Sequence, residues 1–349
     1  MATVAAVAAP APVVRLAGKD DDRFGDALQS ATVRQSSLGL DRLELEVVGF
    51  GDVGGGEPDY AFADVKLGDA LELRMGGDEK RTVFQGEITA LEERHGGGAP
   101  RLLLLAEDAL HRLARARRSR AFQDLSVDDV VRQIASDAQL EAEVEASGSR
   151  GDWHQLNESS LAFLRRLLAP LDVPLRLVDG KVLRAKPFEP SGDAVELDAG
   201  DNVHHVRVVA DLARQYTSVK ARGRDLAAGD EVDHKSDALE PAPAGKSATT
   251  LLRELGWEGE AFAPQPAVAD AVQAEKQALG GFARQNARFV HGELVCDGDP
   301  RLVPGCEIEL KRVSPRFRGR YMVTATVHRF DRDHGYQTLV EVARGDLAP

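Results

Sequence analysis

The feature that most constrains the fold is a series of short alternating segments in the first hundred or so residues, separated by glycine-rich tips. In LDRLELEVVGF, from Leu40 to Phe50, apolar residues alternate with charged ones. DALELRM, RTVFQGEITALEERH and APRLLLLAEDA follow, and GDVGGGEPD, MGGDEK and HGGGAP lie at the tips. A period of two with Gly/Pro turns indicates short strands in a small barrel or sandwich.

The middle of the chain changes to a helical period. Ser126 and Asp129 form a variant of the capping box, and apolar residues follow at helical spacing from Val127 to Ala138. A second helix is predicted to begin near NESS (157–160) and to end at Pro170, with Leu161, Leu164, Leu167 and Leu168 on its apolar face. LDVPLRLVDGKVLRAKP then reads as a hairpin with Asp179-Gly180 at its turn.

The last third returns to β after an interruption. An alternating pattern runs from Val203 to Arg222, and the polar, Pro- and Ala-rich stretch that follows, to about Ser247, reads as an exposed insertion or linker. A helix is expected from Ala267 to about Ala287, weakened by Gly280-Gly281, and β pattern covers Phe289 to Val342. We therefore predict a mainly β, α+β chain.

Composition excludes several functions. The formal net charge is −13, which argues against general nucleic-acid affinity. The one basic run, Arg115 to Arg120, reads as a solvated helix end, with a phosphate or partner patch as the alternative. No apolar run is long enough for a membrane span, and the N-terminus, interrupted by Pro10 and Pro12, is unlike a signal peptide. We expect the chain to be in the cytoplasm at least during synthesis.

Cysteine usage gives no metal or redox motif. Cys296 and Cys306 have neither a second cysteine pair nor a histidine pair beside them at zinc-binding spacing. Two reduced, partly buried thiols are the expected state, and a disulfide is possible if their strands are adjacent.

Two glycine motifs resemble nucleotide-binding loops but lack the surroundings that such loops need. Gly49 to Gly54 matches G-x-G-x-x-G, yet Gly55, Gly56, Glu57 and Pro58 make a poor helix start. Gly245-Lys246-Ser247 resembles the end of a phosphate loop, but Glu240 replaces its first glycine and no strand precedes it. No cofactor site is predicted.

The densest group of potential ligands or catalysts is His328, Asp331, Asp333 and His334. It sits between two alternating segments, and Asp331 to Gly335 has the composition of a turn, in which Asp bonds its own backbone and Gly accepts positive φ. We interpret the group as a hairpin turn rather than a metal site. No catalytic, cofactor-binding or metal residues are predicted, so the chain is not expected to be an enzyme.

Four stretches, taken in order, resemble one protein family: the phage late-control gene D and VgrG-like baseplate hubs of contractile injection systems. They are FQGEITALE (84–92), RAFQDLSVDDVVRQIASDAQLEAEV (120–144), LNESSLAFLRRLLAPLDVPLRLVDGKVL (156–183), and GDPRLVPGCEIELKRV with FRGRYMVTATVHRFDRDHGYQTLVEVAR (298–313 and 317–344). No single stretch is specific, but the series covers most of the chain.

The resemblance implies two tube-like antiparallel β-barrel domains with a small helix-containing α+β domain between them. The expected division is 1–118 for the first barrel, 119–190 for the middle domain, 191–224 with 288–349 for the second barrel, and 225–287 for an inserted linker and helix. It also implies a homotrimeric structural adaptor between a hexameric inner tube and a trimeric spike. Because this chain stops at Pro349, the OB-fold and needle of the spike are expected on a separate protein.

Two other functions stay open at this stage. One is a cell-wall hydrolase carried at a tail tip, for which a pocket with two converging carboxylates would be the sign. The other is a β-rich adaptor outside any injection machine. In the hub interpretation, the chain would assemble in the cytoplasm with the inner tube, spike and other baseplate components. It would then belong to a tail-like particle, which could be released outside the cell, without nucleic-acid binding or membrane insertion.

Overall fold

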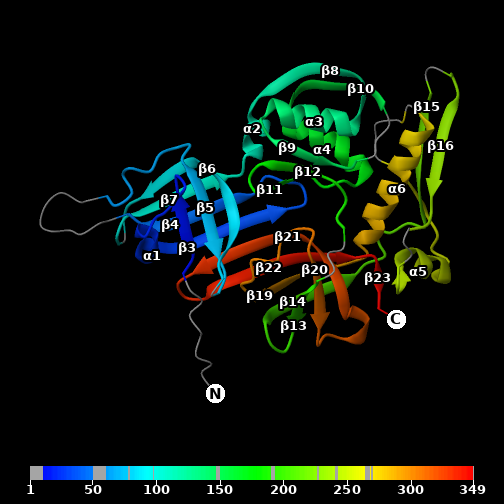
Figure 1. Ribbon diagram of the computed structural model, residues 1–349. Coiled ribbons are helices and arrows are strands. Elements are labelled where there is room, and N and C mark those ends of the chain that lie inside the picture. The colour runs from blue at the N-terminus through cyan, green and yellow to red at the C-terminus, as the bar shows by residue number, and fades with distance from the viewer. Residues whose placement is uncertain are drawn as a thin grey trace, which may run out of the picture.

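A computed structural model describes residues 11–49, 60–77, 79–96, 98–146, 150–189, 193–225, 228–239, 243–263, 268 and 270–348. It is mainly β with fewer helical residues, so the mainly β, α+β fold class predicted from the sequence is confirmed. Two β units lie side by side, a middle unit sits above them and a helix with a hairpin stands at one side (Figure 1).

The first β unit is built from the alternating segments. Its strands are β1 (Val13–Leu16), β2 (Lys19–Asp20), β3 (Leu28–Ser36), β4 (Arg42–Val48), β5 (Ala70–Met75), β6 (Arg81–Arg94) and β7 (Arg101–Glu107), with α1 (Arg23–Ala27) before β3. Every second residue of β4, such as Leu43, Leu45 and Val47, is buried, as the period of two requires. These residues belong to the hydrophobic core of the first β unit.

The middle unit holds three packed α-helices and two small sheets. Its elements are α2 (Leu110–Arg115), β8 (Arg117–Ser126), α3 (Val127–Asp137), β9 (Glu141–Val144), β10 (Arg150–Ser159), α4 (Ser160–Leu168), the 3-10 turn η1 (Ala169–Leu171), β11 (Arg176–Val178) and β12 (Val182–Ala185). The predicted capping box forms: Ser126 Oγ accepts the Asp129 N–H, and the Asp129 carboxylate accepts the Ser126 N–H. Asp179 and Gly180 both have positive φ in the turn between β11 and β12, as predicted.

The second β unit contains β13 (Val195–Asp198), β14 (Val203–Ala210), β19 (Val290–Asp297), β20 (Glu307–Lys311), η2 (Pro315–Phe317), β21 (Gly319–Asp331) and β22 (Gly335–Arg344). It has its own hydrophobic cluster, including Tyr321, Val323, Val340 and Val342. Within the described residues, strand pairing closes neither β unit into a separate ring; both belong to one 13-stranded sheet. The resemblance implies two tube-like β-barrel domains, and in the structure the strands of the two β units continue into one another in this sheet.

The segment between β14 and β19 differs in part from its prediction. The β pattern from Val203 to Arg222 forms two strands, β14 and β15 (Ser218–Arg224), and β15 pairs with β16 (Glu231–Ser236) and β18 (Glu260–Phe262) outside the large sheet. The stretch that was expected to be a linker contains two strands, β16 and β17 (Lys246–Ser247). Of these, β17 pairs with β23 (Asp346–Leu347). The helices there are α5 (Ala248–Leu255) and α6 (Ala271–Ala287).

Gly280, expected only to weaken α6, has a packing role. A Cβ at Gly280 would lie 2.8 Å from the carbonyl oxygen of Pro170 and 2.8 Å from the carbonyl carbon of Leu171. The absence of a side chain thus lets η1 of the middle unit pack directly on α6, which also covers β15 and β16. Among the described residues, no helix has the length and apolar character to cross a membrane.

Candidate assembly site at the junction of the units

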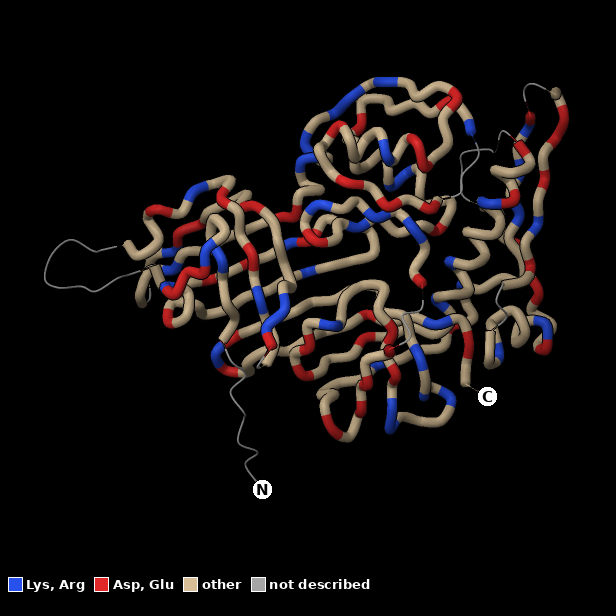
Figure 2. Tube along the Cα trace, viewed as in Figure 1, with Lys and Arg blue, Asp and Glu red and all other residues tan. Residues whose placement is uncertain are grey.

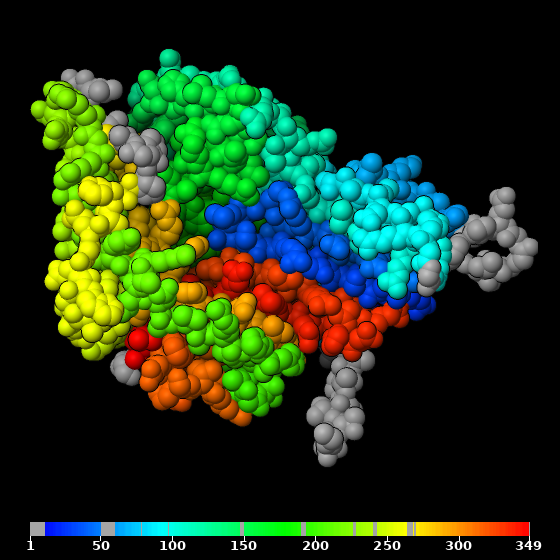
Figure 3. Space-filling view, turned by 180° about the vertical axis from the view of Figure 1, so that it is seen from behind, coloured from blue at the N-terminus to red at the C-terminus, as the bar shows by residue number. Residues whose placement is uncertain are grey.

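The two β units are joined by a strand seam. The C-terminal half of β21 pairs antiparallel with β3, from Ala325 opposite Ser36 to Asp331 opposite Ser30. The N-terminal half of the same strand pairs with β20, and β22 pairs along its other side. In the space-filling view the first strands and the last strands of the chain are in direct contact (Figure 3). One strand therefore belongs to both units, and neither unit can shift without breaking backbone hydrogen bonds.

His328 lies inside this seam, which corrects the sequence-based interpretation of a surface turn residue. Its side chain is 0% exposed, and its Nδ1 lies 2.8 Å from the Tyr336 hydroxyl and 3.3 Å from the Thr338 hydroxyl. Burial lowers the pKa of His328 to about 4, outweighing the Leu302 backbone and the charge of Asp299, which both raise it. The residue was misjudged because β21 continues to Asp331 and the turn begins only at Arg332.

The tip of the hairpin is the turn that the sequence predicts. The Asp331 carboxylate accepts the backbone N–H groups of Asp333 and His334 at 3.0 and 2.7 Å, and lies 2.9 Å from the His334 ring. Gly335 has a φ of 71°. Arg332 extends from the tip and donates to the carbonyls of Leu28, at 2.7 Å, and Asp26. Exposed His334 and buried His328 do not converge, and no metal-binding group of three His, Cys, Asp or Glu occurs in the described ranges.

Behind the seam lies a buried polar network that the sequence analysis missed. Thr326 Oγ1 donates to Gln35 Oε1 at 3.2 Å, and Gln35 Nε2 donates to Asp41 Oδ2 at 2.8 Å. The Asp41 N–H donates to Asp108 Oδ2 at 2.9 Å, and the Leu110 N–H donates to Asp108 Oδ1 at 2.9 Å. The network runs from the second β unit through the first to α2 of the middle unit. Burial raises the pKa of Asp108 to about 7 and that of Asp41 to about 6.

The middle unit is held to both β units by arginines. Arg165 on α4 donates to the carbonyls of Leu38 and Gly39 at 2.8 and 2.9 Å, and its side chain is half-buried. Gly39 has a φ of 70°, and a Cβ there would lie 2.5 Å from the Leu175 carbonyl oxygen. Arg176 donates to the Pro304 carbonyl of the second β unit. These contacts fix the middle unit against both β units.

The remaining candidates are dispersed. Arg115 ends α2, and the rest of the basic run lies on β8, where Lys and Arg follow the outer side of the middle unit (Figure 2).

Cys296 is buried, Cys306 is half-buried, and both are free thiols. Lys246 and Ser247 form β17, Ser247 caps α5 through the Thr250 N–H, and Lys246 pairs with Glu254. Of the G-x-G-x-x-G motif, the part from Phe50 onward lies outside the described residues.

The fold is that of phage and prophage tail proteins. It matches the 43 kDa tail protein of prophage MuSo2 from Shewanella oneidensis with a TM-score of 0.71 at 15% identity, covering 96% of this chain and 98% of the other. It matches the tail protein of Neisseria meningitidis MC58 with a TM-score of 0.68 at 15% identity, covering 97% and 99%. The E. coli c3393 protein, a component of the type VI secretion system with similarity to T4 tail proteins gp27 and gp5, matches with a TM-score of 0.58 at 13% identity, covering 95% and 76%.

The family follows from the sequence. The chain belongs to the family described as the Alg8 N-terminal domain, whose model matches residues 62–331. No protein among those with curated descriptions matches it.

Proposed function

We propose that this chain is the structural baseplate hub of a contractile, phage tail-like injection machine. Three copies would join a hexameric inner tube to a trimeric spike. The observation that supports this most is the seam between β21 and β3, which fixes two β units side by side in one chain. Three such chains around a threefold axis present six β units, which suits a sixfold tube on one side and a threefold spike on the other.

The buried network and the arginine contacts support the same role. An adaptor that transmits force needs units that keep their relative orientation, and here backbone pairing, the Gln35–Asp41–Asp108 network and Arg165 link all three. We further propose that the chain works without catalysis, and that it assembles in the cytoplasm before becoming part of a particle. The hydrolase alternative is not favoured: Asp41 and Asp108 come together, but their oxygens are occupied by Gln35 and by backbone N–H groups.

Native mass spectrometry of the spike-bound assembly tests the stoichiometry, and electron-microscopy class averages of the particle test the ring. Three copies of the chain and six β units around the axis are the expected results. A stable dimer or a closed hexamer bound to the spike would contradict the proposal.

A further inference from the structure

The free edge of β18 lies beside a charged cavity. Among the described residues β18 pairs only with β15, in parallel, from Ser218 opposite Glu260 to Lys220 opposite Phe262. The cavity has a volume of about 590 Å³ and lies between this edge, the C-terminal half of α6 and the outer face of β14, β19 and β22. An unpaired strand edge presents backbone donors and acceptors to any extended chain that reaches it.

Large apolar side chains flank this edge and remain exposed. Phe262 is 60% exposed, Trp257 is 62% exposed and Tyr216 is 41% exposed. The Tyr216 ring lies against Gly259, directly before β18, and Trp257 precedes that glycine by two positions. Exposed Trp, Tyr and Phe at one place are typical of protein interfaces rather than of free surface.

The cavity lining carries cations without ion-pair partners on the α6 side. Arg214 and Arg288 have no ion pair and no side-chain hydrogen bond within the described part of the chain, and Arg284 donates only to the Ala169 carbonyl. On the opposite wall, Glu293 lies between Arg207 and Glu341 across neighbouring strands, so Arg207 balances one of the two carboxylates. Asp211 lines the cavity on the same loop as Arg214, and Asp172 lies near enough to Arg284 and Arg288 that both oppose the rise of its pKa caused by burial. The three arginines on α6 and on the loop before β15 therefore outnumber the two carboxyl groups beside them.

Successive residues of β18 point to opposite faces of its sheet, and the two faces have different surroundings. Ala261 pairs with Val219, which faces α6: a Cβ on Gly281 of that helix would lie 3.2 Å from a Val219 methyl. Glu260 and Phe262 point to the other side, where Glu260 pairs with Lys235. A strand added beside β18 would thus place alternate side chains toward the arginines of α6 and toward the exposed aromatic side chains.

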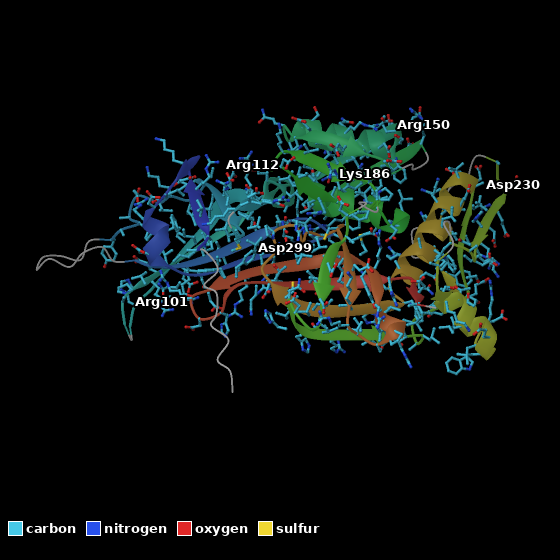
Figure 4. All side chains as sticks on the ribbon, turned by 60° about the horizontal axis from the view of Figure 1, so that its bottom comes forward. Arg101, Arg112, Arg150, Lys186, Asp230 and Asp299 are labelled. Atoms are coloured by element: carbon cyan, nitrogen blue, oxygen red, sulfur yellow. The ribbon has the colours of Figure 1, made fainter. Side chains whose placement is uncertain are left out.

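We propose that the edge of β18 receives an extended segment of another protein in which acidic and apolar side chains alternate. Its backbone would extend the β16-β15-β18 sheet, its carboxylates would face Arg284 and Arg288, and its apolar side chains would cover Phe262. This interface does not depend on the hub assignment, since it rests on the edge, the aromatic residues and the charges alone. Figure 4 shows the molecule with its lower side turned forward. The hairpin of β15 and β16, near Asp230, stands apart from the middle unit, which carries Arg150 and Lys186.

The test is fluorescence anisotropy of the full chain with three labelled peptides: EVEVEVE, its lysine counterpart KVKVKVK, and EVEPEVE, whose central proline interrupts backbone pairing. The acidic peptide should bind, and more weakly as salt rises. The lysine and proline peptides should bind at least about tenfold more weakly, which corresponds to the loss of charge complementarity or of the strand ladder.

Matched charge reversals locate the site. Arg214→Glu with Arg288→Glu should weaken binding of EVEVEVE at least about tenfold. Arg81→Glu with Arg115→Glu changes the net charge equally, at exposed arginines of the first β unit and α2, and should leave binding within about twofold. Equal binding of all three peptides, no binding of EVEVEVE, or equal loss in both double variants would overturn the proposal. Sedimentation that shows self-association of the chain lost only in the first double variant would assign the edge to a second copy, and would overturn it as well.

Discussion

The backbone N–H of Asp41 donates to Oδ2 of Asp108 at 2.9 Å, across the paired strands β4 and β7, and both carboxyl groups are buried where the three units meet. Desolvation is the largest cause of the raised pKa of each group, and the neighbouring carboxylate raises that of Asp108 further. Arg176 opposes the shift at Asp41. The pair therefore holds its protons to higher pH in the folded state than in the unfolded chain.

Asp108→Asn should flatten the dependence of stability on pH between about 8 and 5. In the wild type the folded pKa, about 7, lies above the ordinary value of 3.8, so the free energy of unfolding should rise as pH falls through that range. An Asn side chain does not titrate, so its contribution to the slope disappears. Urea unfolding at several pH values measures this, with exposed Asp333→Asn as the control. Identical slopes in wild type and Asp108→Asn would contradict the assignment.

His328 should produce the opposite trend at lower pH. Its folded pKa of about 4 lies below the ordinary value of 6.5, so the neutral form is favoured in the fold. The part of the free energy of unfolding that comes from this lowered pKa is fully present above pH 6.5 and is lost as pH falls toward 4. The loss is about 1.4 kcal/mol per unit of pKa difference, and hence up to about 3 kcal/mol. The stability difference between wild type and His328→Gln, followed from pH 7 to 4, isolates it. A difference independent of pH would show that His328 does not titrate as a buried group.

The two histidines of the last hairpin should respond differently to truncation. His328→Ala leaves a cavity and removes the partner of the Tyr336 hydroxyl, so it should cost about 2–5 kcal/mol. His334→Ala removes an exposed contact to Asp331 and should cost under about 0.5 kcal/mol. Thermal melts of the two variants give the comparison, and equal losses would place both residues on the surface or both in the core.

Arg165→Ala should loosen the middle unit from the first β unit. The change removes two charge-assisted hydrogen bonds to Leu38 and Gly39, at an expected cost of about 1–3 kcal/mol. Arg166→Ala, which removes the exposed pair with Glu158, should cost under about 1 kcal/mol. Hydrogen exchange should rise near residues 37–39 in the first variant only. Fully buried Leu164→Ala should instead destabilise the core of the middle unit itself, by about 2–5 kcal/mol.

Gly280→Ala should destabilise the protein although alanine favours helices. Helix propensity alone predicts a gain of about 1 kcal/mol. The new Cβ would meet the backbone of Pro170 and Leu171 at 2.8 Å, so η1 and α6 would have to separate. Gly281→Ala is the neighbouring control, because its Cβ would meet only a Val219 methyl, at 3.2 Å. A melting temperature that rises in Gly280→Ala would rule out the close approach of the two backbones.

Local order could be predicted wherever a pattern repeats along the chain. The alternation in β4, the capping box of α3, the apolar face of α4, the Asp179-Gly180 turn and the last hairpin all depend on neighbours within a few residues, so the sequence by itself determined them. The ordered series of motifs also pointed to the fold that the tail proteins share.

Only the tertiary structure decided what depends on partners distant in sequence. Ser36 and Ala325 pair although nearly the whole chain separates them, and no periodicity within either strand specifies that neighbour. The same holds for Gly280 against Pro170 and for Arg165 against Leu38. In β21 a register shift between Val323 and Ala325 reverses the alternation, so that Thr326 and His328 are buried. Whether that face meets solvent or a second β unit depends on the seam. The physical reason is that periodicity fixes which residues share a face, whereas the burial of that face depends on what packs against it.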